Sequence, residues 1–207
     1  SFTARRVVAI QHGKPIFTMS ASFQVVEQGL EHQSAMPDVP DPDKLKSEHE
    51  WRSEILSSIP EHVRPWFLRP RPFEFRPVDP VNRFAEMKHP PRQTLWFRAV
   101  GPLPEETALH QCLLAHASDM TLLDTSLLPH GLTLYAGTLQ TASLDHAMWF
   151  HRSFRADEWL LYVQDSPSGS GARGFNRGAI FRRDGVLIAS VAQEGLIRVR
   201  HGAAGKS

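Results

Sequence analysis

The sequence predicts an α+β fold, in which several antiparallel strands form a curved sheet around one apolar helix. Two observations predict it: an apolar helix pattern near 105–118, and five β-rich runs that follow it. Apolar residues make up 41% of the 207 residues, which is enough for a sizeable core. A helix that is apolar on most of its sides needs a cover, so we expect the sheet to wrap around it.

Before this helix, the chain combines a hairpin with a proline-rich connector. Residues 2–11 and 15–25 are β-rich, and the turn between them contains glycine, which is typical of a hairpin. Eleven of the sixteen prolines fall between residues 31 and 91, as in a segment that crosses a surface. Within this segment we expect a helix near 43–57 and a short strand near 72–78.

The second half of the chain is more regular. A strand is predicted over 93–100, and a helix from Glu105 to about Ser118, because acidic residues occupy its first turn and apolar residues follow at helical spacing. The further strands are predicted near 131–136, 143–152, 158–166, 173–182 and 186–199. The predicted organisation is a hairpin over 1–30, a connector over 31–71, a complete α+β unit over 72–200 and a flexible tail over 201–207.

Composition and charge exclude several classes of protein. The net charge of +1 favours neither nucleic acid nor an anionic membrane as a partner. No apolar run approaches the roughly 20 residues of a membrane span, and no signal peptide is visible. A single cysteine, Cys112, rules out an internal disulfide and fits a reducing compartment. We therefore expect a soluble, cytoplasmic protein that binds neither nucleic acid nor membrane.

Gln193 is the first candidate site residue, because it interrupts an apolar face of the last predicted strand. Strand alternation places it on the same face as Leu187, Ala189 and Val191. A carboxamide on such a face needs hydrogen-bond partners. Two interpretations remain open: a structural glutamine bonded to neighbouring backbone, or a group that orients a water or a substrate carbonyl.

Asp119 follows the predicted helix and is the second candidate. The negative end of a helix and partial burial both disfavour a charged carboxylate. Both effects would suit a general base. The alternative is an aspartate in a solvated loop that makes a local turn.

Ser143 opens the predicted strand 143–152, in a stretch that is rich in reactive groups. Strand alternation turns Ser143 and Asp145 to one face and His146 to the other. This geometry excludes a Ser–His–Asp triad, and the chain has no Gly-x-Ser-x-Gly nucleophile elbow. We therefore expect Asp145 and His146 to be structural.

Two other patterns suggest chemistry that their context does not support. Residues 169–174 satisfy the dinucleotide-binding pattern G-x-G-x-x-G, which requires a helix directly after it. A strand is predicted there instead, so we expect a flexible turn or bulge. The eleven histidines show no zinc-ligand spacing, and we expect no metal.

Three short motifs carry a resemblance to a known family. HASDM at 116–120, SLDHAMWFHR at 143–152 and VAQEG at 191–195 occur in this order. In content and order they closely resemble the acyl-CoA thioesterase II family of double hot-dog proteins, over nearly the whole chain. The resemblance implies a hot-dog fold, in which a sheet wraps around a central helix. It also implies hydrolysis of acyl-CoA to a free fatty acid and coenzyme A.

The resemblance further implies roles for the candidate residues. In this family an aspartate ending the helix, a serine or threonine before the DHxMWFH motif and the glutamine of QEG form the hydrolytic site. The matching positions are Asp119, Ser143 and Gln193. By analogy Asp119 is the main base, the other two orient a water, and the water attacks the thioester without a cofactor. Arg173 and Arg177 are candidates to meet the phosphates of coenzyme A, or else belong to a solvated strand edge.

Compared with the family, the chain is expected to lack an N-terminal stretch, because Ser1 is not an initiator methionine and a strand begins at once. We thus expect an incomplete first hot-dog unit followed by a complete second one. The expected partners are acyl-CoA, further double units in a homo-oligomer, and a separate N-terminal fragment that covers the open hairpin edge. Two other functions remain open: an acyl-CoA-binding hot-dog protein without turnover, and a hot-dog hydratase or dehydratase.

Overall fold

The computed structural model describes residues 2–82, 84–85, 87–135 and 137–200. Its contacts divide the chain into two units, residues 1–33 and residues 34–207. The predicted tail over 201–207 lies outside the described residues.

The first unit is a β-hairpin, as predicted. β1 (Phe2–Gln11) and β2 (Lys14–Gln24) pair antiparallel, and His12 and Gly13 at the turn have φ angles of 50° and 74°. Two successive residues of positive φ match the twist of paired strands and allow this tight turn. Large apolar side chains of the hairpin, Phe17 among them, remain exposed. The two strands therefore pair with each other along their length, but their large apolar side chains are not buried.

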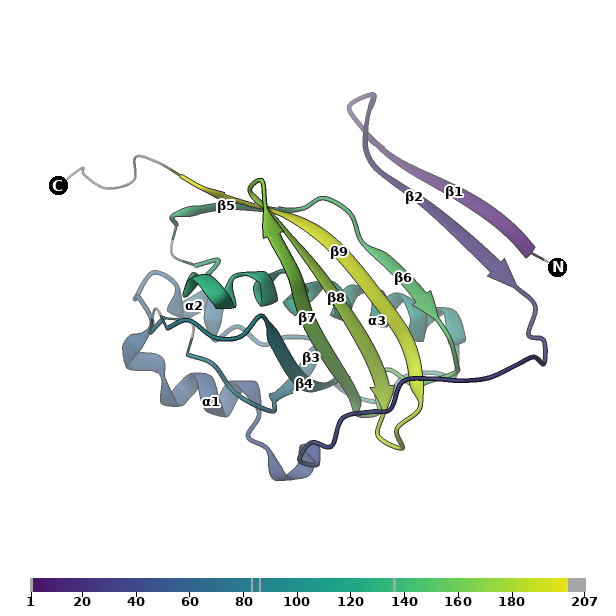
Figure 1. The fold of residues 1–207 in the computed structure, drawn as a ribbon, viewed down its shortest axis with the longest axis horizontal. Helices are drawn as coiled ribbons and strands as arrows, with labels where there is room; N and C mark the ends of the chain where they lie inside the picture. The colour runs from purple at the N-terminus through teal and green to yellow at the C-terminus, as the bar shows by residue number, and fades with distance from the viewer. Residues whose placement is uncertain (1, 83, 86, 136, 201–207) are drawn as a thin grey trace. The chain divides into compact units, whose positions relative to one another are not determined.

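The second unit is built on a seven-stranded sheet whose pairs are all antiparallel (Figure 1). The strands run in the order β3-β4-β7-β8-β9-β5, and β6 pairs with the other half of β9. They are β3 (Phe73–Pro77), β4 (Arg92–Ala99), β5 (Leu139–Ser143), β6 (Ala147–Phe150), β7 (Leu160–Ser170), β8 (Arg173–Arg182) and β9 (Leu187–Val199). The strands predicted near 72–78, 93–100, 158–166, 173–182 and 186–199 are confirmed.

The strand predicted over 131–136 is wrong. A short 3-10 helix, η4 (Leu128–His130), ends at Gly131 with φ of 64°, and the chain then enters turns. Tyr135 in this stretch instead stacks on Phe84 of the connector, with ring centroids 5.7 Å apart.

A β-bulge breaks the strand predicted over 143–152 into β5 and β6. Ser143 pairs with Gly195 of β9, and Ala147 pairs with Ala192, so four steps on one side face three on the other. One extra residue reverses the face to which the following side chains point. Met148 accordingly packs against the core under the helix, although strict alternation from Ser143 would turn it away.

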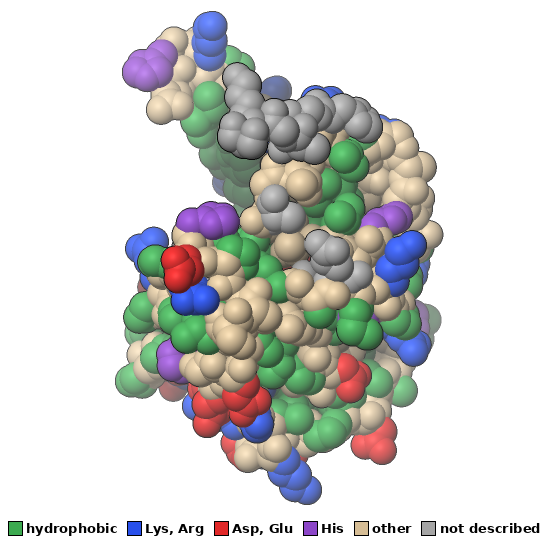
Figure 2. Space-filling model, turned by 90° about the vertical axis from the view of Figure 1, so that its left-hand side faces the viewer, with side chains coloured by type: hydrophobic (Ala, Val, Ile, Leu, Met, Phe, Trp, Pro, Cys, Tyr) green, Lys and Arg blue, Asp and Glu red, His purple; other side chains and the backbone are tan. Residues whose placement is uncertain are grey.

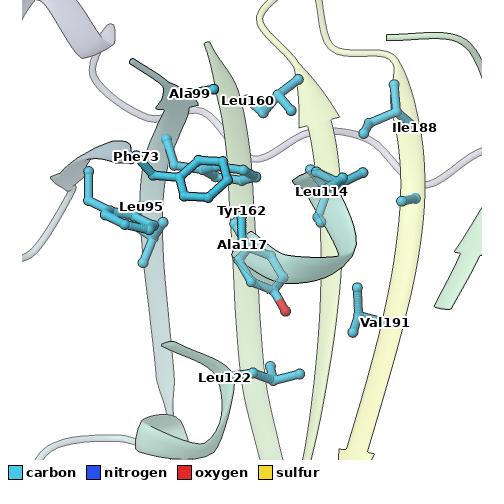
Figure 3. Packing of buried hydrophobic residues seen from close by; sticks show 14 residues of the cluster. Phe73, Leu95, Ala99, Leu114, Ala117, Leu122, Leu160, Tyr162, Ile188 and Val191 are labelled. Carbon is cyan, nitrogen blue, oxygen red and sulfur yellow. The ribbon is translucent and has the colours of Figure 1, made fainter. Parts of the chain in front are cut away.

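The central helix, α3 (Thr107–Leu122), lies against one face of the sheet. The prediction of this helix is confirmed, but it runs about a turn beyond Ser118 and continues as a 3-10 helix, η3 (Leu123–Ser126). Figure 3 shows the buried side chains between helix and strands, which include Leu114, Ala117, Leu122, Tyr162, Ile188 and Val191. A Cβ atom at Gly195 would overlap Leu123, so glycine lets the end of the helix lie directly on β9.

The connector contributes short helices rather than the single helix predicted over 43–57. These are η1 (Pro42–Lys44), α1 (Glu48–Glu54), η2 (Leu56–Ser58) and α2 (Arg64–Phe67). Ser47 caps α1 in a reciprocal capping box with Glu50, which makes the helix begin at residue 48. Connector side chains such as Leu45 cover Trp96 on the outer face of the sheet.

Charged side chains of both signs are mixed on the surface. On the face in Figure 2, basic and acidic side chains lie next to each other, in line with the net charge of +1. Arg183 shows the same pattern, because it pairs with Asp41 and Asp43 of the connector. Within the described residues, no helix is long and apolar enough to cross a membrane.

Candidate active site

Three elements of the second unit carry the three predicted site residues. Asp119 lies in the last turn of α3, Ser143 is the last residue of β5, and Gln193 lies in the middle of β9. Ser143 therefore ends a strand rather than opening one, because the bulge starts directly after it.

The three side chains meet at one carboxylate oxygen. Oδ1 of Asp119 accepts hydrogen bonds from Oγ of Ser143, at 3.3 Å, and from Nε2 of Gln193. Nε2 of Gln193 also donates to Oγ of Ser143, at 3.1 Å. The fold thus brings together side chains that are up to 74 positions apart in the sequence.

Gln193 is the buried member of the group. It is 0% exposed, as its place on an apolar face predicted, and it shares this face with Ala189 and Val191. Leu187 packs on the outer face instead, because the register between β8 and β9 shifts beside it. Oε1 of Gln193 accepts no hydrogen bond from the described residues, so a fully buried amide keeps an open acceptor.

Asp119 and Ser143, in contrast, are exposed. The prediction that Asp119 is partly buried is therefore wrong: α3 presents it at the surface of this chain. Two donors that converge on a carboxylate fix its orientation, and a carboxylate in a fixed orientation can take a proton from a water molecule. The carboxylate of Asp119 is thus held by one buried residue, Gln193, and one exposed residue, Ser143.

The bulge places two further polar side chains next to the site. Oδ1 of Asp145 accepts a hydrogen bond from the backbone N of Glu194, at 2.8 Å. Nε2 of His146 lies 3.0 Å from Oγ of Ser118. Each contact thus reaches the chain neighbour of a site residue, Gln193 in the first case and Asp119 in the second.

These contacts correct the prediction that Ser143 and His146 face opposite ways. The extra residue in the bulge turns His146 towards α3, which is also the side of Ser143. A Ser–His–Asp triad is still absent within the described residues, because His146 contacts Ser118 and Asp145 contacts backbone. Sequence alternation missed this because a bulge is defined by the register of the partner strand.

Arg173 and Arg177 lie on the opposite face of the sheet from the site. Asn176, between them in β8, pairs with Gln193 and faces inward, so its neighbours of odd number face outward. Nε of Arg173 lies 3.5 Å from Oε1 of Glu194, and Arg177 forms an ion pair with Asp165. The structure does not bring these arginines to Asp119, and their role towards coenzyme A stays a prediction.

The glycine-rich pattern at 169–174 forms a turn, as predicted. Gly171 and Ala172 have φ angles of 57° and 59°, and β8 follows them directly. A cavity of about 730 Å³ lies elsewhere, between the connector, β4 and the end of α3, and its lining does not include the site residues. Over the described part of the chain, no group of three or more His, Cys, Asp or Glu side chains is arranged to hold a metal ion.

Sequence comparison shows which known proteins the chain resembles. The profile of the family described as acyl-CoA thioesterase matches residues 63–196, which include all three site residues. The chain is 40% identical over 198 residues to acyl-CoA thioesterase 2 of Haemophilus influenzae, and 39% identical over 215 residues to human acyl-coenzyme A thioesterase 8. These alignments cover 96% and 97% of this chain, and 69% and 65% of the two relatives.

Solved structures agree with the sequence comparison. A crystal structure of an acyl-CoA thioesterase II, TesB2 from Mycobacterium marinum, aligns with a TM-score of 0.76 and 42% identity, over 98% of this chain and 70% of that one. A protein of hot-dog fold from Alicyclobacillus acidocaldarius aligns with a TM-score of 0.72 at 18% identity, over 97% and 69%. The predicted α+β hot-dog fold is confirmed. The chain, which spans about two thirds of the length of its curated relatives, belongs to the acyl-CoA thioesterase family.

Proposed function

We propose that the chain hydrolyses acyl-CoA thioesters to a free carboxylic acid and coenzyme A, by direct attack of a water molecule. The observation that carries this proposal is the convergence of Ser143 and Gln193 on one carboxylate oxygen of Asp119. The names of the two curated relatives, both acyl-CoA thioesterases, support the choice of substrate.

In the proposed step Asp119 takes a proton from the water while the water oxygen bonds to the thioester carbonyl carbon. The tetrahedral intermediate then collapses, the C–S bond breaks, and the proton passes from Asp119 to the departing thiolate. One water is consumed for each thioester. The nucleophile in this step is the water and not Ser143, so no acyl-enzyme forms; Ser143 donates a hydrogen bond to Asp119 and helps to orient the water.

In this proposal Gln193 helps to orient the water. Its Nε2 bonds to both Asp119 and Ser143, which fixes these two exposed groups relative to each other. Its Oε1 is buried and accepts no bond from the described residues, so the amide acts on the site through Nε2. A base and a nucleophile placed in advance remove much of the entropic part of the barrier.

The test is thiol release from butyryl-, octanoyl- and palmitoyl-CoA by the full chain and by Asp119→Ala. We expect the wild type to release thiol, and the variant to lose about 10²- to 10⁴-fold in kcat because it lacks the base. Thermal unfolding should not change, because Asp119 is exposed. Cys112 is also exposed and reacts with thiol reagents, so a blank with protein alone is subtracted.

Each other outcome contradicts a defined part of the proposal. Saturable binding of acyl-CoA without thiol release by the wild type would support a non-catalytic acyl-CoA-binding protein. Addition of water to an enoyl-CoA double bond, again without thiol release, would support a hydratase. Full activity of Asp119→Ala would refute the site while leaving the activity in place.

On the resemblance alone, we further propose that the protein works in the cytoplasm and that double hot-dog units associate into a homo-oligomer. The exposed position of Asp119 and Ser143 leaves room for a second surface to close over the thioester. Exclusion of bulk water around the reacting atoms would strengthen the electrostatic contribution of the carboxylate.

A further inference from the structure

Ser118, the residue before Asp119, is held from two sides. Its backbone carbonyl accepts a hydrogen bond from the hydroxyl of Tyr162, at 3.1 Å, and its Oγ lies 3.0 Å from Nε2 of His146. Burial raises the pKa of Tyr162 well above its usual value, so this hydroxyl keeps its proton and remains a donor. The turn of α3 that carries Asp119 is therefore fixed both to β7 and to the bulge.

The direction of the bond between His146 and Ser118 follows from the serine hydroxyl. Its single proton is donated to the carbonyl of Ala115, at 2.9 Å, so Oγ accepts from His146. Nε2 of His146 therefore carries a hydrogen. Partial burial of the ring lowers the pKa of His146, against the charges of Asp119 and Asp145, which raise it. The bond exists in either protonation state, because Nε2 donates in this neutral tautomer and in the imidazolium.

The other side of the bulge is bonded to β9. Asp145 accepts a hydrogen bond from the backbone N of Glu194, and the backbone N of Leu144 donates to the carbonyl of Glu194, at 2.9 Å. Glu194 directly follows Gln193 in the chain. The bulge thus bridges the residue next to Asp119 and the residue next to Gln193.

We propose that His146 is a positioning residue of the hydrolytic site, which acts through Ser118 to hold Asp119 against Ser143 and Gln193. This inference rests on the proposed function. His146 bonds to Ser118 and not to a side chain of the catalytic group, so its effect is on geometry. A shift of about 1 Å in a catalytic group can lower a rate about 10²-fold.

The experiment is a double-mutant cycle on kcat, measured with the acyl-CoA that the wild-type chain cleaves fastest. His146→Leu removes the donor and keeps much of the bulk, and Ser118→Ala removes the acceptor. We expect each variant to lower kcat about 10-fold with KM within about twofold, and the double variant to lower it no further. His146→Gln, whose amide can still donate, should keep most of the activity.

The chain offers a matched control in a second histidine–serine pair. Nε2 of His151 lies 2.8 Å from Oγ of Ser190, which pairs with Ala179 on the outer face of the sheet. His151→Leu and Ser190→Ala remove the same kind of contact without touching α3. We expect both controls to keep kcat within about twofold of the wild type.

Several results would overturn the proposal. The first is a kcat of His146→Leu equal to that of the wild type while Asp119→Ala is inactive. The second is a double variant in which the two losses of kcat multiply. The third is a loss of kcat in His151→Leu or Ser190→Ala as large as that in His146→Leu. Thiol release that is absent in the wild type would instead remove the proposed function itself. If His146→Leu does not fold, His146→Asn, whose shorter amide does not reach Ser118, takes its place in the cycle with the same criteria.

Discussion

Gln164 and Gln193 face the same helix from two strands of one sheet, and their amides are used in opposite ways. Gln164 is 1% exposed and both ends of its amide are bonded: Nε2 donates to Thr121, and Oε1 accepts from Gln93 and Thr125. Gln193 is 0% exposed and donates to two side chains, but its Oε1 accepts nothing from the described residues.

This difference distinguishes a buried amide that stabilises the fold from one that supports the candidate site. A buried amide with both ends bonded recovers the free energy that it lost on leaving water, and it holds its partners in place. An open acceptor in the same position costs free energy unless a ligand uses it. Burial alone therefore does not identify a site residue; what distinguishes Gln193 from Gln164 is that its Nε2 bonds the side chains of Asp119 and Ser143.

Among substitutions that test this comparison, the largest expected effect is on the activity of Gln193→Met, which keeps the volume of the side chain and removes the amide. We expect kcat to fall about 10²-fold, equivalent to about 2.7 kcal/mol in the activation barrier. The free energy of unfolding should change little, because the exposed Asp119 and Ser143 stay hydrated. Thiol release and urea unfolding measure the two effects. An unchanged kcat would show that Gln193 is structural, as Gln164 is.

The same substitution at Gln164 should give the reverse result. Gln164→Met removes the hydrogen bonds that the buried amide makes with Gln93, Thr121 and Thr125, so we expect the free energy of unfolding to fall by about 2 kcal/mol. The kcat of the folded fraction should stay within a few fold of the wild type. A loss of kcat as large as that of Gln193→Met would contradict the distinction between the two amides.

The smallest expected effect is a pH dependence of stability, which we expect from the surroundings of Gln193 and not from those of Gln164. Partial burial lowers the pKa of His146, beside the Gln193 cluster, below its ordinary 6.5. The folded chain then binds fewer protons than the unfolded chain, so stability is present above about pH 6.5 and is lost as the pH falls through the folded pKa. The loss should be less than about 1 kcal/mol, because the ring keeps an exposed edge.

Urea unfolding at pH 7.5 and pH 5.5 measures this effect, with His146→Gln as the variant that should reduce it. The Gln164 partners Gln93, Thr121 and Thr125 carry no group that titrates in this range. The destabilisation by Gln164→Met should accordingly be the same at both pH values. His151, whose pKa burial also lowers, contributes equally to both chains, so a pH dependence that is the same in the wild type and in His146→Gln would contradict this prediction.

The sequence predicted an element correctly where a few consecutive residues determine its structure. Helix α3 follows from the spacing of its apolar residues, and the hairpin turn follows from the glycine at position 13. The stretch around Tyr135 shows where this fails, because it forms turns and its Tyr135 stacks on Phe84 of the connector. The error at 43–57 was avoidable, since Ser47 and Glu50 form a capping box that can be read in the sequence.

The candidate site was only partly predictable. The apolar face of β9 indicated that Gln193 is buried, but its meeting with Asp119 depended on the resemblance to a family. The position of His146 was not predictable from alternation, because one extra residue opposite β9 reverses the face of everything after it. The extra residue becomes apparent only when the pairing of β5 and β6 with β9 is known.

The bulge also makes the spacing of the SLDHAMWFHR motif as important as its letters. Ser143 and Met148 are five residues apart, an odd number, yet both point to the helix side of the sheet. Without the bulge, simple alternation over the same five residues would turn Met148 out of the core. The length of this stretch, and not only its composition, therefore determines which of its side chains face α3.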